Sequence, residues 1–216
     1  MVETSQDDQV PKAVVNRMSL YLRELQQLLR SGRNTTSSTQ LGQLLGFTDA
    51  QVRKDLAHFG QFGYPGIGYH CEELTSAIRR ILGTDQDWPV AIVGVGNLGR
   101  ALLGYQGFGH QGFSVVAAFD ADSTKVGGRI EGIAVYSIDD LEKIVRRERI
   151  RLGMITVPAG AAQQVAERLA RSGVEGIVNF APVTLVEPAG ICVVGVDLAI
   201  ELEQLSFAVV SRNKKP

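Results

Sequence analysis

The sequence predicts an α/β protein in which a winged helix-turn-helix domain precedes a Rossmann-type domain with a doubly wound parallel sheet. Before about residue 85, apolar residues recur at helical spacing. After it, short runs rich in valine and isoleucine alternate with helical stretches, which favours a parallel sheet. A glycine-rich turn, Gly94–Gly99, follows the first of these runs. We expect the domains to span 1–84 and 85–196, with a closing helix and tail over 197–216.

Composition limits the classes of function without choosing one. The 216 residues are 44% hydrophobic and carry a formal net charge of −1, so nucleic-acid binding has to be argued from local pattern. Neither a secretory signal nor an apolar run long enough for a bilayer is evident. Cys71 and Cys192 lie far apart without metal-site spacing. We therefore expect a reduced, cytoplasmic protein with neither a metal nor a membrane partner.

The first three predicted helices come before residue 60. The first runs from about Pro11 to Leu29, the second begins near Ser38 after side chains that suit an N-cap, and the third covers 49–59 after Thr48. Two short helices joined by a glycine-containing turn are typical of a helix-turn-helix. The outward residues of the third helix can reach phosphates or base edges, and those at the start of the second lie nearby. These predicted DNA contacts are Gln51, Arg53, Lys54 and His58, with Ser37 and Ser38.

The segment 60–69 contains four glycines, a proline and aromatic residues, which suit a short hairpin. We interpret it as the wing of a winged helix, with Tyr64 and Gly66 as further DNA contacts. A fourth helix is expected over 72–82. In the second half, strands are expected over 90–93, 113–119, 133–136, 152–157, 176–180 and 191–194. Helices are expected from the glycine turn to about 105, and over 139–149, 160–173 and 197–210.

The glycine turn predicts a dinucleotide site. Gly94 permits the tight turn, Gly96 lets the backbone approach a pyrophosphate, and Gly99 lets helix and strand pack closely. Asp120 ends the second strand at the spacing of an acidic residue that binds the adenosine ribose. Its charge repels a 2′-phosphate, so NADH and NAD⁺ are favoured over their phosphorylated forms. Lys125 lies nearby and weakens that preference slightly.

Later strand ends complete the predicted cofactor site, because ligands of open α/β sheets lie at the carboxyl ends of the strands. One such end precedes a helix near 159, and another near 179 is a candidate for the nicotinamide side. The predicted cofactor-binding residues are Gly94, Gly96, Asn97, Leu98, Gly99, Asp120, Lys125, Thr156, Val157, Pro158, Asn179, Phe180 and Ala181.

No catalytic residue is predicted, because no acid or base is evident beside the nicotinamide. His58 and His70 fall in the first domain, and His110 lies in a loop where a solvated side chain is the simpler interpretation. Three alternatives stay open. The chain could be an NAD-dependent dehydrogenase with a helical extension, or a CoA-binding module. It could also be a winged-helix domain used for protein contact.

Several segments resemble the Rex family of bacterial redox-sensing repressors, and the likeness extends over roughly 10–210. Two lie in the helix-turn-helix, over 38–42 and 50–56, and two in the wing region, Phe59-Gly60 and 66–69. Three lie in the second half, over 179–182, 196–198 and 205–207.

The resemblance implies a homodimer that binds palindromic operator DNA with NAD⁺ or no nucleotide and releases it when NADH binds. It also implies that the closing helix swaps across the dimer. Arg23, Tyr105 and Asp197 fall where the family places a redox-dependent polar switch between protomers. For Asp197, which starts a predicted helix, an N-cap is an equally good interpretation. Position 97 is Asn97, where some relatives carry a basic residue.

Overall fold

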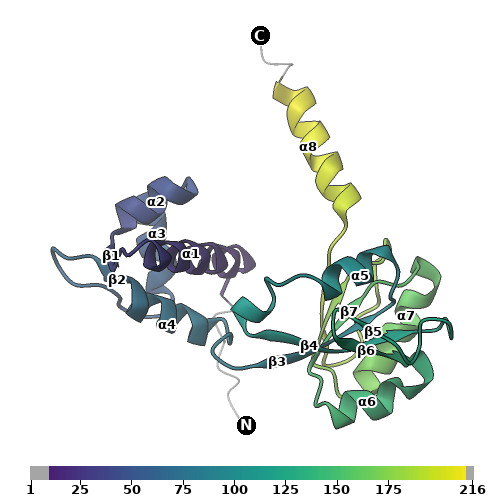
Figure 1. Cartoon of the computed structure of the whole chain (residues 1–216). Coiled ribbons are helices and arrows are strands. Elements are labelled where there is room, and N and C mark those ends of the chain that lie inside the picture. Colours follow the sequence, from purple (N-terminus) through teal and green to yellow (C-terminus); the bar gives the residue numbers. More distant parts are fainter. Residues whose placement is uncertain (1–9, 213–216) are drawn as a thin grey trace, which may run out of the picture. The chain divides into compact units, whose positions relative to one another are not determined.

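The structure is a computed structural model that describes residues 10–212. The segments 1–9 and 213–216 lie outside the described residues, and with them the end of the predicted tail. The chain divides into two compact units, one ending at Gln86 and one beginning at Asp87, and each is described by itself (Figure 1).

Unit 1 is helical with a small sheet. Its elements are α1 (Lys12–Arg30), β1 (Thr35–Thr36), α2 (Ser38–Leu45), α3 (Asp49–Ala57), β2 (Tyr69–His70) and α4 (Cys71–Ile81). The apolar face of α1 packs against α2, α3 and α4, as its helical periodicity predicts. Met18, Tyr21 and Leu25 are fully buried at its centre.

The helix-turn-helix is fixed by local capping. The Ser37 side chain caps α2 by accepting a hydrogen bond from the backbone N–H of Gln40, and the Gln40 side-chain oxygen accepts one from the backbone N–H of Ser37. Gly46 ends α2 in the left-handed region, with φ of 74°. The Thr48 side chain then accepts from the N–H of Gln51 at 3.1 Å and starts α3. The predicted helix-turn-helix is therefore confirmed.

The wing differs from the hairpin expected within 60–69, because its sheet includes β1, which lies outside that segment. Strand β1 pairs antiparallel with β2, with Thr36 opposite Tyr69. Inside the loop between α3 and β2, a single β-bridge joins Tyr64 and Gly68. A Cβ at Gly68 would collide with the carbonyl oxygen of Thr36, so glycine is what lets the two strands approach. The pairing joins segments more than 30 residues apart, which a local pattern does not reveal.

Unit 2 contains a seven-stranded sheet in the order β5-β6-β4-β3-β7-β8-β9, in which all neighbours except β5 and β6 are parallel. The strands are β3 (Trp88–Val93), β4 (Phe113–Asp120), β5 (Arg129–Ile130), β6 (Ile133–Ser137), β7 (Leu152–Ile155), β8 (Gly176–Asn179) and β9 (Cys192–Gly195). Without β5, this is the doubly wound order of dinucleotide-binding domains, with its switch point between β3 and β7.

Helices cover both faces of the sheet (Figure 1). On one face, α6 (Leu141–Arg147) and α7 (Ala159–Arg171) pack on alternate strand residues such as Val93 and Phe119. On the other, α5 (Asn97–Leu103) packs on the intervening residues, such as Ile92 and Ala118. This alternation follows from the two-residue period of a strand.

Three local features of unit 2 differ from the expected ones. The helix predicted over 139–149 begins as a 3-10 turn, Ile138–Asp140, and ends at Arg147. Arg149 has φ of 52°, which a continuing helix does not allow. Strand β5 was not predicted, because two residues carry no detectable period. A second 3-10 turn, Gly109–Gln111, holds the exposed His110.

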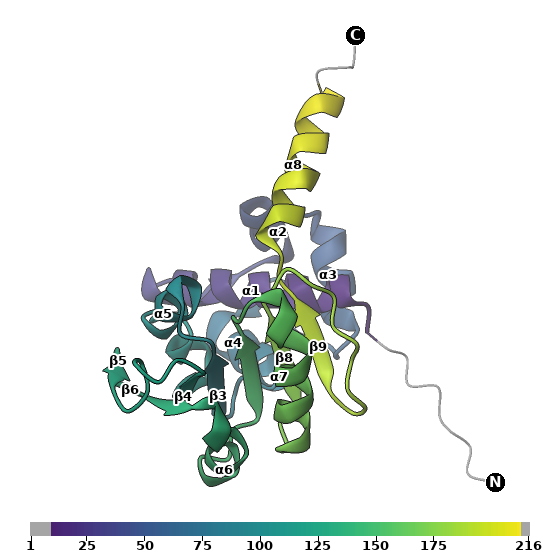
Figure 2. The same cartoon turned by 90° about the vertical axis from the view of Figure 1, so that its right-hand side faces the viewer.

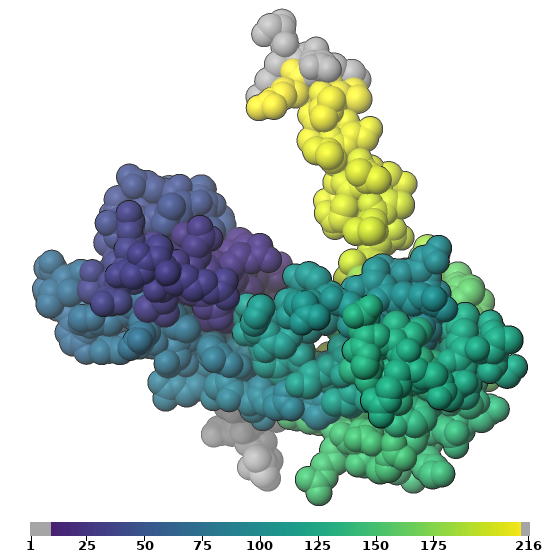
Figure 3. All heavy atoms as spheres, viewed as in Figure 1, coloured from purple at the N-terminus to yellow at the C-terminus, as the bar shows by residue number. Residues whose placement is uncertain are grey.

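The last helix, α8 (Leu198–Arg212), contains no buried residue. Figure 2 shows it leaving the end of β9, and in Figure 3 its yellow atoms stand clear of the sheet. Leu198, Leu202, Leu205 and Phe207 are 60–75% exposed. Within residues 10–212, no helix combines the length and apolar character that a membrane span requires.

Candidate functional site

The glycine turn has the geometry that its spacing predicts. Gly94 has φ of +100°, and a Cβ there would lie 2.8 Å from the carbonyl of Thr156. A Cβ at Gly99 would collide with the carbonyl oxygen of Gly94, so the close approach of α5 to β3 requires glycine. A Cβ at Gly96 would meet nothing within 4 Å, which leaves open the space that the sequence predicts for a pyrophosphate.

Asp120 ends β4 beside this turn and is 9% exposed. Its Oδ2 accepts from the backbone N–H of Val95 at 2.7 Å, and its Oδ1 accepts from the N–H of Asp122 at 2.9 Å. Burial raises the pKa of Asp120, but those two hydrogen bonds and one from Lys125 outweigh burial and lower it overall. A charged carboxylate therefore stands at the end of β4.

Lys125 is engaged with the same carboxylate. Its Nζ lies 3.1 Å from Oδ2 of Asp120 and 3.7 Å from Asp122. Two carboxylates thus lie beside a single ammonium, which leaves a net negative charge at the end of β4. A 2′-phosphate placed there meets repulsion, in keeping with the predicted preference for NAD(H).

A pocket of about 690 Å³ opens at the switch point, where β3 and β7 diverge. It gathers seven of the predicted cofactor residues from the ends of three strands. They are Gly94, Gly96, Asp120, Lys125, Thr156, Val157 and Pro158. Its wall also holds Arg168 of α7, which pairs with Glu142 and was not predicted. Thr156 fixes the turn by donating its hydroxyl to the carbonyl of Gly94 at 2.6 Å.

The remaining predicted cofactor residues lie outside this pocket's wall. Asn97, Leu98 and Gly99 form the first turn of α5. Phe180 is partly buried and packs against the apolar cluster that includes Leu103 of α5. Asn179 and Ala181 line a second pocket instead.

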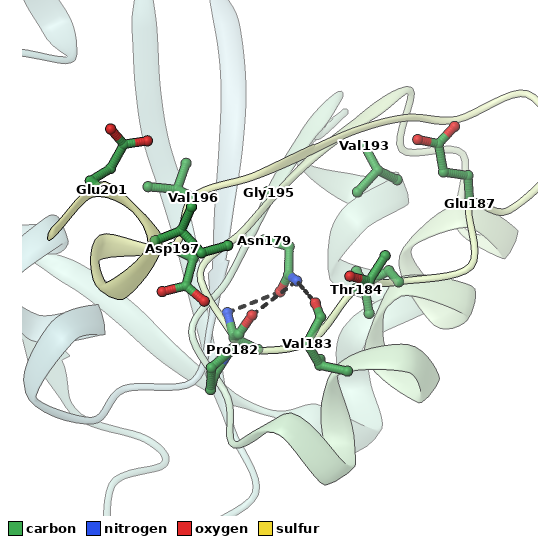
Figure 4. Close-up of a pocket in the computed structure, with 13 residues that line it drawn as sticks. Asn179, Pro182, Val183, Thr184, Glu187, Val193, Gly195, Val196, Asp197 and Glu201 are labelled. Carbon is green, nitrogen blue, oxygen red and sulfur yellow. Dashed lines mark hydrogen bonds between the residues drawn. The ribbon is translucent and has the colours of Figure 1, made fainter. Parts of the chain in front are cut away.

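The second pocket, of about 410 Å³, lies between the loop after β8 and the start of α8 (Figure 4). Buried Asn179 closes that loop, because its Nδ2 donates to the carbonyl of Val183 at 2.8 Å and its Oδ1 accepts from the N–H of Ala181 at 3.0 Å. Asp197, which precedes α8, and Glu201 of α8 line the same pocket. The polar atoms of Asn179 are therefore already engaged with the loop's backbone.

The three predicted switch residues occupy different elements. Arg23 is exposed on α1 in unit 1. Tyr105 follows α5, is 57% exposed, and packs its ring edge-on to Phe108 at 4.9 Å. Asp197 accepts from the backbone N–H of Ala199 at 2.8 Å, which is the contact of an N-cap residue. Asp197 thus has a helix-capping contact, and its role in a switch stays a prediction.

The outer surface of α3 is polar, and one of its side chains, Arg53, is held by hydrogen bonds. Arg53 donates to Asp49 at 2.7 Å and to the hydroxyl of Ser38 at 3.1 Å, so it links α3 to the start of α2. Lys54 and His58 are exposed. Such side chains at a recognition helix suit contacts to phosphates and bases.

Gln51 departs from the expected outward position. It is half-buried, and its Nε2 donates to Oδ1 of Asp55 at 2.7 Å. Asp55 is fully buried, and the sequence interpretation missed it. Its position three residues after Val52, on the helix face that packs against α1, could have indicated a buried carboxylate.

The wing places Tyr64 and Gly66 at its exposed tip. Tyr64 is 50% exposed, packs edge-on to His70 and donates to Glu73 at 3.4 Å. Gly66 has φ of +77°, a conformation that favours glycine. Among residues 10–212, no group of three or more histidine, cysteine or acidic side chains is arranged to hold a metal.

Two family models match the chain. Residues 9–57 match "Putative DNA-binding protein N-terminus", and residues 85–183 match "CoA binding domain". Proteins named redox-sensing transcriptional repressor Rex match over almost the whole chain. The one from Carboxydothermus hydrogenoformans is 47% identical over 93% of this chain and 96% of its own. The one from Streptomyces coelicolor is 48% identical over 92% and 77%. The chain belongs to the Rex family.

Solved structures support the same assignment. RSP, a Rex-family repressor, has been solved in complex with NAD⁺ and operator DNA. That structure is 34% identical, covers 94% of both chains and has a TM-score of 0.89. RSP in complex with NADH is 33% identical over 95% of this chain and 96% of its own, with a TM-score of 0.84. This Rex chain therefore has a winged-helix domain followed by a Rossmann-type domain, as the sequence predicts.

Proposed function

We propose that this Rex chain is a repressor that binds a palindromic operator as a homodimer and releases it when NADH binds. The main support is the switch-point pocket, where the Gly94–Gly99 turn and the ionised Asp120 meet in a chain that also carries a recognition helix. RSP supplies further support, since it is known with NAD⁺ and operator DNA and with NADH.

The switch rests on the charge of the nicotinamide ring. The ring of NADH is neutral and can enter a less polar environment, whereas the cationic ring of NAD⁺ resists desolvation. NADH can move the dimer only through a higher affinity for the state that does not bind DNA. In that state, the two α3 helices are spaced wrongly for successive major grooves. Arg23, Tyr105 and Asp197 are proposed to differ in their contacts between the two states.

A homodimer accounts for the exposed apolar side chains of α8. A 15-residue helix is marginal in water without packing, and α8 buries none of its residues in the single chain. Four large apolar side chains on it are 60–75% exposed, which is typical of an interaction surface. A second copy of the chain is the proposed partner for this surface.

We propose that the site senses its ligand without catalysis. The nucleotide pocket's wall contains no histidine, cysteine or tyrosine, and its charged residues are Asp120, Lys125, Asp139 and Arg168. Asp120, Lys125 and Arg168 are each paired with other residues. A DNA-bound repressor of this kind acts in the cytoplasm, and we propose that location.

Operator binding at defined nucleotide ratios tests the function. A labelled palindromic, AT-rich duplex is titrated with the protein, and NADH is then added in a fixed NAD⁺ background. We expect NADH to release the DNA at concentrations where NAD⁺ does not. Equal release by both nucleotides would contradict the proposal.

Substituting alanine for Arg53 and Lys54 should abolish operator binding, and unchanged binding would favour a protein-contact role.

The match to CoA-binding domains calls for a direct comparison of ligands. Calorimetry with NADH, NAD⁺, NADPH and CoA is expected to give the tightest binding for NADH. Tighter binding of CoA would support the alternative module. Turnover of a small carbonyl substrate with NADH, lost in His110→Ala, would support the dehydrogenase.

A further inference from the structure

The recognition helix α3 carries a carboxylate with no exposed surface. Asp55 accepts four hydrogen bonds from three side chains. Arg17 of α1 donates from Nε at 2.6 Å and from Nη2 at 2.8 Å. Tyr21 of α1 donates its hydroxyl at 2.8 Å, and Gln51 of α3 donates its amide at 2.7 Å. The carboxylate therefore joins α3 to α1 and also holds a side chain of α3 itself.

The ionised state of Asp55 determines which way the Gln51 amide faces. Burial raises the pKa of Asp55, but the bonds from Arg17, Tyr21 and Gln51 outweigh it and lower the pKa overall. A charged carboxylate only accepts hydrogen bonds, so the Gln51 amide must present its nitrogen to Asp55. Exchanging the amide oxygen and nitrogen would place two acceptors against each other.

This contact leaves a defined pair of polar groups on Gln51. One of the two N–H groups is used by Asp55, and the carbonyl Oε1 and the second N–H remain. An acceptor beside a donor matches the N6 amino group and N7 of adenine in the major groove. Gln51 lies in the first turn of α3, and the N-terminal residues of a recognition helix are those that contact base edges.

We propose that Asp55 is a positioning residue for base readout, which holds the Gln51 amide so that α3 reads one adenine in each operator half-site. The inference rests on the proposed function, because it assumes that α3 enters the major groove. Arg17 donates two of the four hydrogen bonds and keeps the carboxylate in place, while Gln51 alone of these side chains contacts the base.

Selection from a randomised palindrome tests the proposal, using full-length protein without NADH. Gln51→Met keeps the length of the side chain but removes the amide. Asp55→Asn keeps the shape but can offer either an acceptor or a donor to Gln51. Both variants should lose the preference for adenine at least tenfold at the same position, with preferences at other positions unchanged. The control Tyr21→Phe, which retains the contact between Asp55 and Gln51, should keep the adenine preference.

Loss of discrimination at every position in Asp55→Asn would mean that Asp55 only holds the helix, and would overturn the proposal. So would an unaltered adenine preference in Gln51→Met. A wild-type protein that selects no palindrome would instead contradict the proposed function. Circular dichroism of each variant monitors folding.

A measurement on the wild-type protein covers the case in which Asp55→Asn does not fold. The side-chain amide of Gln51 is assigned by NMR from its absence in Gln51→Met. One of its two protons should exchange slowly with solvent in the DNA-free protein. Two equally fast protons would overturn the proposed orientation.

Discussion

At the scale of single residues, Gly99 and Gly96 meet two different requirements of the glycine turn: close packing of α5 on β3, and open space for a ligand. A methyl group at Gly99 meets the carbonyl of Gly94, whereas one at Gly96 meets open space. We expect Gly99→Ala to lose about 1–3 kcal/mol of unfolding free energy through overpacking. Gly96→Ala should keep stability within about 0.5 kcal/mol but weaken NADH binding, because the methyl occupies the approach of the pyrophosphate. Thermal unfolding and calorimetry on both variants measure the two effects, and a Gly96→Ala protein that binds NADH normally would contradict this assignment.

Asp120 makes the second residue-scale prediction. In Asp120→Asn the charge is lost, and Lys125 keeps only its longer contact with Asp122. We expect NADH affinity to fall about tenfold or more, since hydrogen bonds to charged groups contribute about 1.5–3 kcal/mol. The affinity for NADPH should fall less, so that the ratio of the NADH affinity to the NADPH affinity decreases. Calorimetry with both nucleotides measures this, with Asp122→Asn as the control that keeps Asp120. An unchanged preference in Asp120→Asn would show that another residue selects the cofactor.

At the scale of elements, α8 is predicted to be the dimer contact. Leu202→Glu and Leu205→Glu each place a charge on a side chain that is at least 60% exposed in the single chain. In a monomer such surface substitutions change the free energy of unfolding by no more than about 0.5 kcal/mol. Across a dimer they occur twice, and burying each leucine is worth about 1.5–3 kcal/mol, so the dimer should weaken at least a hundredfold. Sedimentation gives the dissociation constant, with Glu203→Gln as the control. Unchanged dimers in both leucine variants would place the interface elsewhere.

The elements also show what the sequence can predict. Long helices such as α1 and α7 were located to within two residues, because their burial follows a regular period. The pairing of β1 with β2 and the short β5 escaped prediction, since each depends on tertiary partners. At the site, glycine spacing and Asp120 were predictable from a local motif. The hydrogen bonds that Asp55 accepts from α1 were not, because Arg17 and Tyr21 lie more than 30 residues away in the sequence.

At the scale of the whole molecule, each unit contains carboxylates whose charge stabilises the fold. The pKa of Asp55 in unit 1 is lowered, and Arg168 lowers the pKa of Glu142 in unit 2 to about 2. A lowered pKa in the folded state gives stability that is present above the unfolded value, about 4, and lost as pH falls through the folded value. Stability should therefore decline from about pH 5 and continue to fall toward pH 2. Urea unfolding across this range measures the decline. Glu142→Gln should flatten it and Asp85→Asn, at an exposed carboxyl, should not; equal slopes in all three proteins would contradict the assignment.

The exposed apolar surface of α8 has a consequence for gene dosage. If operator binding requires two copies joined through this helix, the active species forms from two chains. Below the dissociation constant, halving the chains made per cell lowers the number of dimers about fourfold. The number of repressor dimers would then change more steeply than in direct proportion to the number of chains made. A promoter controlled by this repressor would register small changes in the repressor's synthesis as well as changes in NADH.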